Sequence, residues 1–224
     1  MNNNVIKAER KPIRKNIGYR FVKRTFDIIC SVLALVVLSP VLLITAIAIL
    51  CEDGGPVIYK QKRVGKNKRV FEIYKFRSMR KDADKIHAQM KAQYVESDVS
   101  FKLEDKDDPR ITKVGRFIRK TSIDELPQLV NIIAGHMSIV GPRPLPTYEF
   151  EDEQEKYEGA YDERYDVPQG LTCYWQITFG ERGRIVFDKR MQMDVDYAND
   201  ANAWVDIKLI WKTFVGVLFG KSGY

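Results

Sequence analysis

The chain has 224 residues, enough for one ordinary hydrophobic core or two small ones, and its hydrophobic content of 45% excludes a disordered protein. The formal net charge of +7 comes from residues 1–24, which hold eight Lys or Arg and one acid, so the remaining 29 basic and 29 acidic residues balance and argue against a nucleic-acid binder. Three cysteines without paired spacing favour a reducing, cytosolic environment, and two histidines disfavour a histidine-rich metal site, while a hard cation on carboxylates and phosphate stays open.

The first segment, residues 1–24, is a basic arm directly before an apolar segment. Anionic lipid head groups attract Lys and Arg side chains near a membrane surface. We therefore expect this arm to contact inner-leaflet phospholipids.

The apolar segment is expected over residues 25–52, with 23 uncharged residues in a row from Ile28 to Leu50. A straight helix of that length would reach about 34 Å, enough to cross a bilayer core of about 30 Å. Ser39-Pro40 lies at its middle, however, and predicts a sharp kink because proline removes a backbone hydrogen bond. Basic residues at both ends give no preferred orientation, so we expect a re-entrant helix with both flanks in the cytosol. A kinked helix that spans the membrane is the alternative.

Residues 56–76 predict a β-hairpin, with β-branched and aromatic residues on both sides of a turn at 65–68. Residues 78–94 carry apolar side chains at helical spacing, which predicts an amphipathic helix packed on the core. A charged loop then leads to a short basic helix after Pro109.

The stretch TSIDELPQLVN, residues 121–131, places Asp124 beside Glu125 with Pro127 close behind. One interpretation is a capping box, in which Ser122 caps a helix and Glu125 reaches back to it. Pro127 fits that poorly, because it would fall at the fifth helical position and lose a hydrogen bond. We expect an irregular turn that points the two carboxylates in distinct directions.

The same stretch suits phosphoryl chemistry. A helix start offers free N–H groups and partial positive charge, so we expect both carboxylates to stay ionised there and phosphate oxygens to bind beside them. Nearby cations would let a carboxylate approach a diphosphate, and Mg²⁺ would take a carboxylate and phosphate oxygens as ligands. The sequence supplies such cations at Arg110, Arg116, Arg119, Lys120 and Arg143.

Arg143 lies between Pro142 and Pro144, whose rings restrict the backbone and leave the guanidinium little freedom. This arrangement fits a phosphate contact. It fits equally well an arginine that satisfies carbonyl groups of its own loop, and both interpretations stay open.

The C-terminal part holds an acidic segment and an apolar helix. Residues 148–166 contain nine acids and predict a solvated helix or loop. Residues 204–219 predict a helix with an apolar stripe and with Asp206 off that stripe, which either closes the core or lies in the membrane interface. The stripe consists of Ile207, Ile210, Trp211, Phe214, Val215 and Leu218.

Four stretches carry a resemblance to a known family: KRTFDIICSVLALVVLSPVLL, GPVIYKQKRVGKNKRVFEIYKFRSMR, DPRITKVGRFIRKTSIDELPQLVNIIAGHMSIVGPRPLP and the weaker VPQGLTCYWQI. Together they resemble the bacterial sugar transferase family, the monotopic polyprenyl-phosphate phosphoglycosyl transferases. The resemblance implies an α+β fold, with a re-entrant membrane helix kinked at Ser39 and Pro40, a small β-hairpin, and short and amphipathic interfacial helices around a cytosolic-face active site. It implies the small, catalytic-core form at the bacterial inner membrane, with residues 53–224 as the catalytic domain.

The resemblance also implies a reaction: transfer of a sugar 1-phosphate from a UDP-sugar to a polyprenyl (undecaprenyl) phosphate, with Mg²⁺, as the first step of polysaccharide or glycan assembly. Asp124 would be the nucleophile that expels UMP and forms an aspartyl phosphosugar, and also the metal ligand. Glu125 would be its partner in a catalytic dyad. Arg119 and Arg143 match family positions that bind phosphate, and Lys75 is a further substrate contact.

The stretch PQGLTCYWQ departs from the family pattern by one extra residue and by Cys173-Tyr174. This stretch would help to recognise the sugar or the nucleotide, so the identity of the sugar that relatives use is not carried over to this chain. A membrane-attached scaffold without catalysis is the alternative function, a nucleic-acid binder is a weaker third, and a homo-oligomer stays open.

Overall fold

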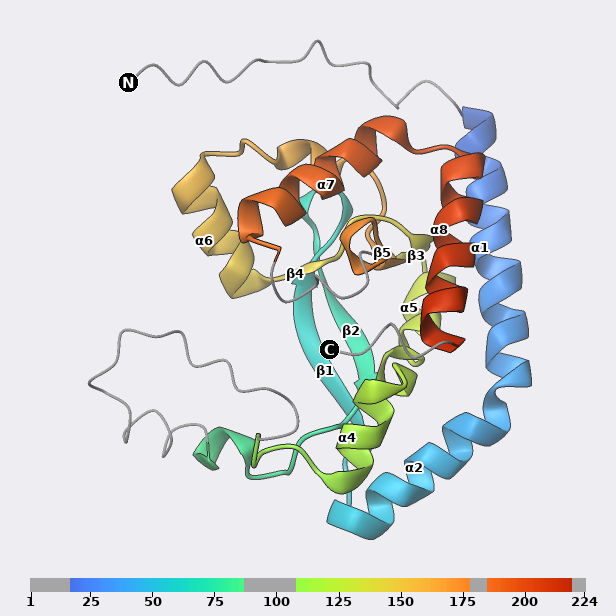
Figure 1. Ribbon diagram of the computed structural model, residues 1–224, viewed down its shortest axis with the longest axis vertical. Coiled ribbons are helices and arrows are strands. Elements are labelled where there is room, and N and C mark those ends of the chain that lie inside the picture. The colour runs from blue at the N-terminus through green and yellow to red at the C-terminus, as the bar shows by residue number, and fades with distance from the viewer. Residues whose placement is uncertain (1–16, 87–107, 178–184, 219–224) are drawn as a thin grey trace.

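The computed structural model describes residues 17–86, 108–177 and 185–218, and its elements form a helix-rich α+β fold, as expected (Figure 1). The larger sheet has the order β2-β1-β4, and β3 and β5 form a separate parallel pair. The strands are β1 (Ile58–Val64), β2 (Val70–Phe76), β3 (Ser138–Val140), β4 (Leu145–Pro146) and β5 (Gly170–Thr172). The α-helices are α1 (Ile17–Val37), α2 (Ser39–Asp53), α4 (Lys113–Lys120), α5 (Gln128–Ile133), α6 (Thr147–Tyr157), α7 (Phe187–Asp200) and α8 (Ala203–Leu218). Short 3-10 turns are η2 (Lys66–Lys68), η3 (Ile123–Glu125), η4 (Asp162–Tyr165) and η5 (Trp175–Ile177).

The apolar segment forms two helices, α1 and α2, bent by 61° where they meet, and the pair follows one edge of the molecule (Figure 1). Pro40 lies in the first turn of α2, where a missing N–H removes no helical hydrogen bond. The hydroxyl of Ser39 donates to the carbonyl oxygen of Val36 at 2.7 Å. The kink expected at Ser39-Pro40 is therefore confirmed. Within the described residues, no helix alone has the length and apolar character to cross a membrane, whereas the bent pair taken together has both.

Two basic residues next to this segment, Lys23 and Arg24, turn toward the protein. α1 already begins at Ile17, inside the segment assigned to the basic arm. The guanidinium of Arg24 donates to the carbonyl oxygens of Ile132 at 2.5 Å and Ile133 at 2.8 Å, at the C-terminal end of α5. Lys23 likewise binds a backbone carbonyl, that of Val140. These two residues join α1 to the folded domain, and residues 1–16 lie outside the described part.

The predicted hairpin is confirmed, because β1 and β2 pair antiparallel from Ile58↔Phe76 to Val64↔Val70 around the turn η2. Helix α5 packs across it. The side chain of Asn131 accepts from the backbone N–H of Tyr74 at 2.9 Å and donates to the carbonyl oxygen of Glu72 at 2.6 Å. The oxygen and the nitrogen of this side-chain amide thus both hold α5 on β2, which brings the acid-pair turn before α5 to the same strand.

The helix predicted over 78–94 is wrong at its start. Met79 forms an isolated β-bridge with Ile111, and helical residues begin only at Ala83. Residues 87–94 lie outside the described part.

The short basic helix predicted after Pro109 is confirmed as α4. A Cβ on its Gly115 would lie 1.9 Å from the carbonyl oxygen of Ser78, so only glycine allows this close approach.

Part of the stripe predicted for the last helix packs on the core, because Ile210 is partly buried against the cluster that contains Leu209. Ile207, Trp211 and Phe214 are exposed on α8, whereas Asp206 and Leu209 are buried. The alternative that this helix closes the core is therefore confirmed in part, but its buried face includes Asp206, which the prediction placed off the stripe. The prediction that segment 148–166 is solvated is wrong for one of its acids. Glu153 is buried and accepts from the hydroxyl of Tyr165 at 3.2 Å.

Candidate active site

The acid pair lies on an irregular turn between α4 and α5. The capping-box interpretation is wrong, because Ser122 adopts a left-handed conformation with φ of 58° and its side chain makes no capping bond. Asp124 and Glu125 then form the 3-10 turn η3, and Pro127 precedes α5. At this position proline gives up no helical hydrogen bond, so the chain reverses without a broken helix.

Glu125 is held by two cations. One of its carboxylate oxygens, Oε1, lies 2.8 Å from Nζ of Lys75 and 3.2 Å from a guanidinium nitrogen of Arg143. Burial alone would raise the pKa of Glu125, but Lys75 and Arg143 outweigh it and hold the pKa well below its usual range. Glu125 is therefore an anion throughout the neutral range.

Asp124 is buried beside this anion and lacks an ion pair of its own among the described residues. Its Oδ1 atom has no hydrogen-bond partner in the described part of the chain. Burial first, and then the charge of Glu125, raise the pKa of Asp124 from 3.8 to about 6, against the opposing charges of Lys75, Arg119 and Arg143. Both acids are thus ionised at neutral pH, as expected, although burial and not a helix start dominates the pKa of Asp124. At pH 7 a group with this pKa is still roughly nine-tenths ionised.

The structure brings the sequence-predicted cations together only in part. Lys75, on β2, and Arg143 contact Glu125 directly, and Arg119 on α4 acts on Asp124 through its charge. Arg110 instead pairs with Asp108 at 2.6 Å. The remaining two predicted cations, Arg116 and Lys120, are exposed on α4.

The loop that carries Arg143 is held from several sides. A Cβ on Gly141 would lie 2.2 Å from the carbonyl oxygen of Pro168, so this loop and the segment before β5 touch through their backbones. The carbonyl oxygen of Arg143 accepts from Arg164 at 2.6 Å, and Arg164 also forms a fully buried ion pair with Asp194 at 2.6 Å. Arg164 thus satisfies a carbonyl of this loop, and the guanidinium of Arg143 is directed at Glu125.

A pocket of about 160 Å³ adjoins the acid pair through Arg143. Its walls include Arg63 on β1 and Arg190 on α7, with Trp175 between the arginines: the guanidinium carbons of Arg143 and Arg190 lie 5.8 Å and 5.6 Å from the centre of its ring. Burial first, and then the like charge of Arg143, lower the pKa of Arg63 to about 10. Clustered guanidinium groups that raise one another's energy are stabilised by an anion placed between them.

Sequence reasoning missed Arg63, Arg190 and Trp175. Arg63 stood out only as one of several basic residues near the apolar segment, and Arg190 had no local signal at all. Trp175 lay in the stretch noted for its departure from the family. These residues come from β1, α7 and η5, so only the folded chain places them in one pocket.

The described residues contain no cluster of three or more His, Cys, Asp or Glu side chains able to hold a metal ion. A cation that takes a single protein carboxylate together with phosphate oxygens needs no such cluster. The buried, unpartnered Oδ1 of Asp124 is an atom that fits this use.

Comparison with known proteins gives a consistent result. The family model described as bacterial sugar transferase matches residues 18–220. The chain is 45% identical over 205 residues to galactosyl transferase CpsE of Streptococcus agalactiae, covering 92% of this chain and 44% of that protein. It is 41% identical over 209 residues to undecaprenyl-phosphate galactose phosphotransferase of Salmonella typhimurium, covering 92% and 42%.

A shorter relative is covered over most of its length. The exopolysaccharide production protein ExoY of Sinorhizobium fredii is 38% identical over 206 residues, which are 90% of this chain and 88% of that protein. The chain therefore spans less than half the length of the first two relatives and most of the third.

Proposed function

Because this chain belongs to the bacterial sugar transferase family, we propose that it transfers a sugar 1-phosphate from a UDP-sugar to undecaprenyl phosphate and so begins the assembly of a bacterial polysaccharide. The observation that carries this proposal is the pair Asp124 and Glu125. One acid is paired with two cations, and the other is buried with an oxygen that has no partner among the described residues. The names of two relatives, which specify undecaprenyl-phosphate galactose phosphotransferase and UDP-glucose:undecaprenyl-phosphate glucose-1-phosphate transferase, support the substrate class.

In the first step a carboxylate oxygen of Asp124 attacks the phosphorus that carries the sugar. A bond forms between these two atoms, and the bond from that phosphorus to the oxygen bridging the two phosphates breaks. The electron pair of the broken bond leaves with UMP. The product is an aspartyl phosphosugar, and the burial of Asp124 favours the reaction because the carboxylate gives up little hydration when it attacks.

In the second step an oxygen of undecaprenyl phosphate attacks the same phosphorus. The bond to Asp124 breaks, the carboxylate is regenerated, and the product is an undecaprenyl diphosphate sugar. Two displacements at one phosphorus keep the two anionic substrates from having to meet each other directly, since the enzyme carries the phosphosugar between them.

The cations around the acid pair make the approach of anion to anion feasible. Arg143 reaches Glu125 on one side and the arginine-lined pocket on the other, so it can bind the diphosphate as the phosphorus–oxygen bond breaks. Glu125 in turn holds Lys75 and Arg143 in place. Arg119 contributes positive charge near Asp124.

Mg²⁺ fits this site through the buried Oδ1 of Asp124 and would supply positive charge to the substrate phosphates. Asp124 is the residue that would hold it. Glu125 has less freedom for such a role, because its Oε1 already accepts from two cations.

For the membrane we propose a re-entrant arrangement on the cytoplasmic face of the inner membrane. The bent pair α1 and α2 exposes apolar side chains such as Leu33, Ile44 and Ile47, which lipid tails would cover. The exposed Trp204 and Trp211 on α8 suit the boundary between lipid and water. The basic arm would add contacts with anionic head groups.

The experiment that tests the function measures UMP release by the full chain in the presence of Mg²⁺ and undecaprenyl phosphate, with UDP-galactose and UDP-glucose as separate donors. UMP release that requires Asp124, together with a phosphosugar adduct on that residue detected by mass spectrometry when the lipid is withheld, supports the proposal. An Asp124→Asn variant that still turns over at the rate of the parent chain would overturn the assignment of the nucleophile. No UMP from any UDP-sugar would favour the scaffold alternative.

A further inference from the structure

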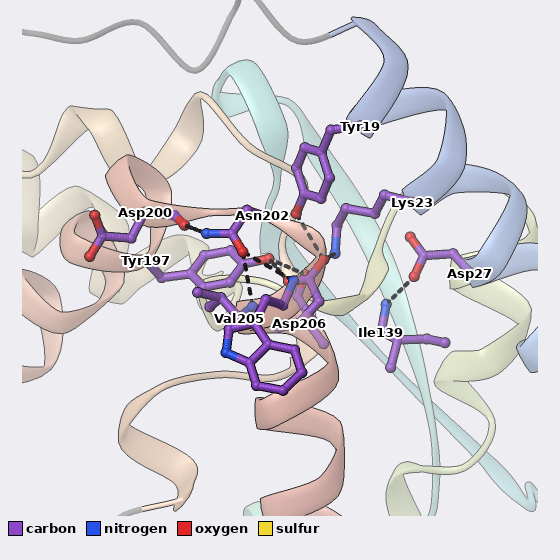
Figure 2. A network of polar contacts seen from close by, with 11 residues as sticks. Tyr19, Lys23, Asp27, Ile139, Tyr197, Asp200, Asn202, Val205 and Asp206 are labelled. Carbon is purple, nitrogen blue, oxygen red and sulfur yellow. Dashed lines mark hydrogen bonds and ion pairs between the residues drawn. The ribbon is translucent and has the colours of Figure 1, made fainter.

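A buried cluster of polar side chains lies far along the sequence from the acid pair (Figure 2). Asp206, on α8, is at its centre. One of its carboxylate oxygens accepts from the hydroxyl of Tyr197 at 2.7 Å, and the other from Nζ of Lys23 and the hydroxyl of Tyr19, each at 2.8 Å. The side chains of Lys23 and Asp206 are only 10% and 11% exposed. Helix α1 is thereby joined to α7 and α8.

The cluster ends on the backbone of strand β3. The carbonyl oxygen of Val140 accepts from Nζ of Lys23 at 3.0 Å, and the hydroxyl of Tyr197, whose single proton is shared between this carbonyl and Asp206, lies 3.1 Å from it. One residue earlier, the N–H of Ile139 donates to a carboxylate oxygen of Asp27 at 3.0 Å (Figure 2). Two successive residues of β3 are therefore held by side chains of α1. Burial and the charge of Asp206 raise the pKa of Tyr197 well above its usual value, so its hydroxyl stays a donor.

Only Gly141 and Pro142 separate Val140 from Arg143, and this connection has little slack. The N–H of Gly141 donates to the carbonyl oxygen of Thr172 at 3.0 Å, and the carbonyl oxygen of Pro142 accepts from the N–H of Gly170 at 2.8 Å. The proline ring restricts the backbone further. A displacement of the Val140 carbonyl would therefore move the backbone that carries Arg143.

We propose that Lys23, held by Asp206 and acting with Tyr197 on the carbonyl of Val140, is a positioning residue that sets the place of Arg143 relative to Glu125 and so couples the N-terminal helix to the reaction. This inference rests on the proposed function, in which Arg143 binds the diphosphate. Its physical basis is direction: hydrogen bonds to a carbonyl oxygen fix where that oxygen lies, whereas an apolar contact of the same size would not. A helix that the membrane holds can in this way fix an active-site arginine.

The simpler account is that the cluster only stabilises the fold. Buried ion pairs are weak evidence for stability, because removing two charges from water costs about as much as their attraction returns. If the cluster only stabilised the fold, replacing Lys23 or Tyr197 would lower the free energy of unfolding of the whole chain, without a selective effect on the loop that carries Arg143. The two accounts therefore differ in which residues exchange their amide hydrogens faster, and in whether the loss of kcat/KM depends on Arg143.

The first experiment needs no activity. Amide hydrogen exchange of the full chain in detergent is measured for Lys23→Met and Tyr197→Phe, the second of which removes one oxygen atom and should fold. We expect exchange over residues 138–146 to become roughly tenfold faster in both variants, with smaller changes elsewhere. The matched control is Arg24→Met, which removes a neighbouring cation of α1 whose partners lie on α5, and should leave 138–146 unchanged.

The second experiment is a double-mutant cycle on kcat/KM for the UDP-sugar that the chain accepts. Lys23→Met and Tyr197→Phe should each lower kcat/KM about tenfold when Arg143 is present and much less when Arg143→Lys has already disturbed the contact with Glu125. Thr213→Val is the control on α8. It removes the 2.6 Å contact with Thr172, leaves Lys23 and Asp206 intact, and should keep activity.

The outcomes separate this inference from the proposed function. Equal losses of activity with and without Arg143, or exchange that rises evenly over the whole chain, would overturn the positioning role and leave the transferase proposal standing. Faster exchange confined to residues 138–146 in a chain that releases no UMP from any donor would overturn the proposed function while the link from α1 to the Arg143 loop remains.

Discussion

The ammonium group of Lys75 lies 2.8 Å from a carboxylate oxygen of Glu125, and this pair makes the two adjacent acids unequal. The pKa of Glu125 is held well below its usual range, while the pKa of its neighbour Asp124 rises to about 6. Adjacent acids pushed in opposite directions can take different roles. Glu125 holds the two cations, and Asp124 keeps an oxygen without a partner among the described residues, as its proposed role as nucleophile requires.

The first prediction concerns Asp124→Asn, which should abolish UMP release and stabilise the fold near neutral pH. The folded-state pKa of Asp124 lies above its ordinary value of 3.8, so ionisation opposes folding increasingly as the pH rises above 3.8, and fully above about 6. Removing that charge should raise the free energy of unfolding by up to about 3 kcal/mol. Thermal unfolding of both chains in detergent, without Mg²⁺, measures this change in the free energy of unfolding.

The pH dependence is the control for this prediction. Because the cost belongs to the ionised form, the gain of Asp124→Asn should shrink as the pH falls from about 6 and be gone below 3.8. A gain in stability that is the same at acid and neutral pH would show that the charge of Asp124 is not its cause.

The second prediction concerns Glu125→Gln, which should act in the opposite direction. The folded-state pKa of Glu125 lies below its ordinary value, so its charge stabilises the fold above that value, and this contribution is lost as the pH falls. Removing the anion leaves Lys75 and Arg143 without their shared partner, which should cost about 3 kcal/mol at neutral pH. If Glu125→Gln is as stable as the parent chain at neutral pH, the two ion pairs contribute nothing net.

The third prediction concerns the arginine-lined pocket. Arg190→Met should raise KM for the UDP-sugar about tenfold with a smaller change in kcat, because one charge-assisted contact with the diphosphate is lost. Arg116→Met, an exposed arginine on α4, is the matched control and should leave both constants unchanged. Equal effects of the two substitutions would mean that general positive charge, and not this pocket, attracts the donor.

The fourth prediction concerns topology. Arg20→Cys and Lys85→Cys, exposed on either side of the bent pair, should both resist a membrane-impermeant thiol reagent in intact cells and react once the membrane is opened. The Cys51→Ser background removes an exposed native thiol. Labelling of one position in intact cells would indicate a helix that spans the membrane. Pro40→Ala tests the kink directly, since it restores a backbone N–H at the bend.

The local elements with a strong pattern were predictable, and the exceptions have physical reasons. Ser39-Pro40 forces a bend in any surroundings, and the hairpin follows from its own turn and side chains. The last helix was found, but its buried face was predicted only in part, because Asp206 gains three hydrogen-bond donors from distant α1 and α7. The spacing of apolar residues along a helix does not reveal hydrogen-bond donors that come from distant helices.

The sequence by itself determined the family, the bent apolar segment, and the pair Asp124 and Glu125 with Lys75, Arg119 and Arg143 as its candidate cations. Those features depend on short motifs and on covalent properties of proline that hold before folding. The tertiary structure alone decided which cations touch Glu125, why Asp124 titrates apart from it, and that Lys23 reaches the strand leading to Arg143. Charge interactions depend on distance and burial, and both come into being only when separate segments pack together.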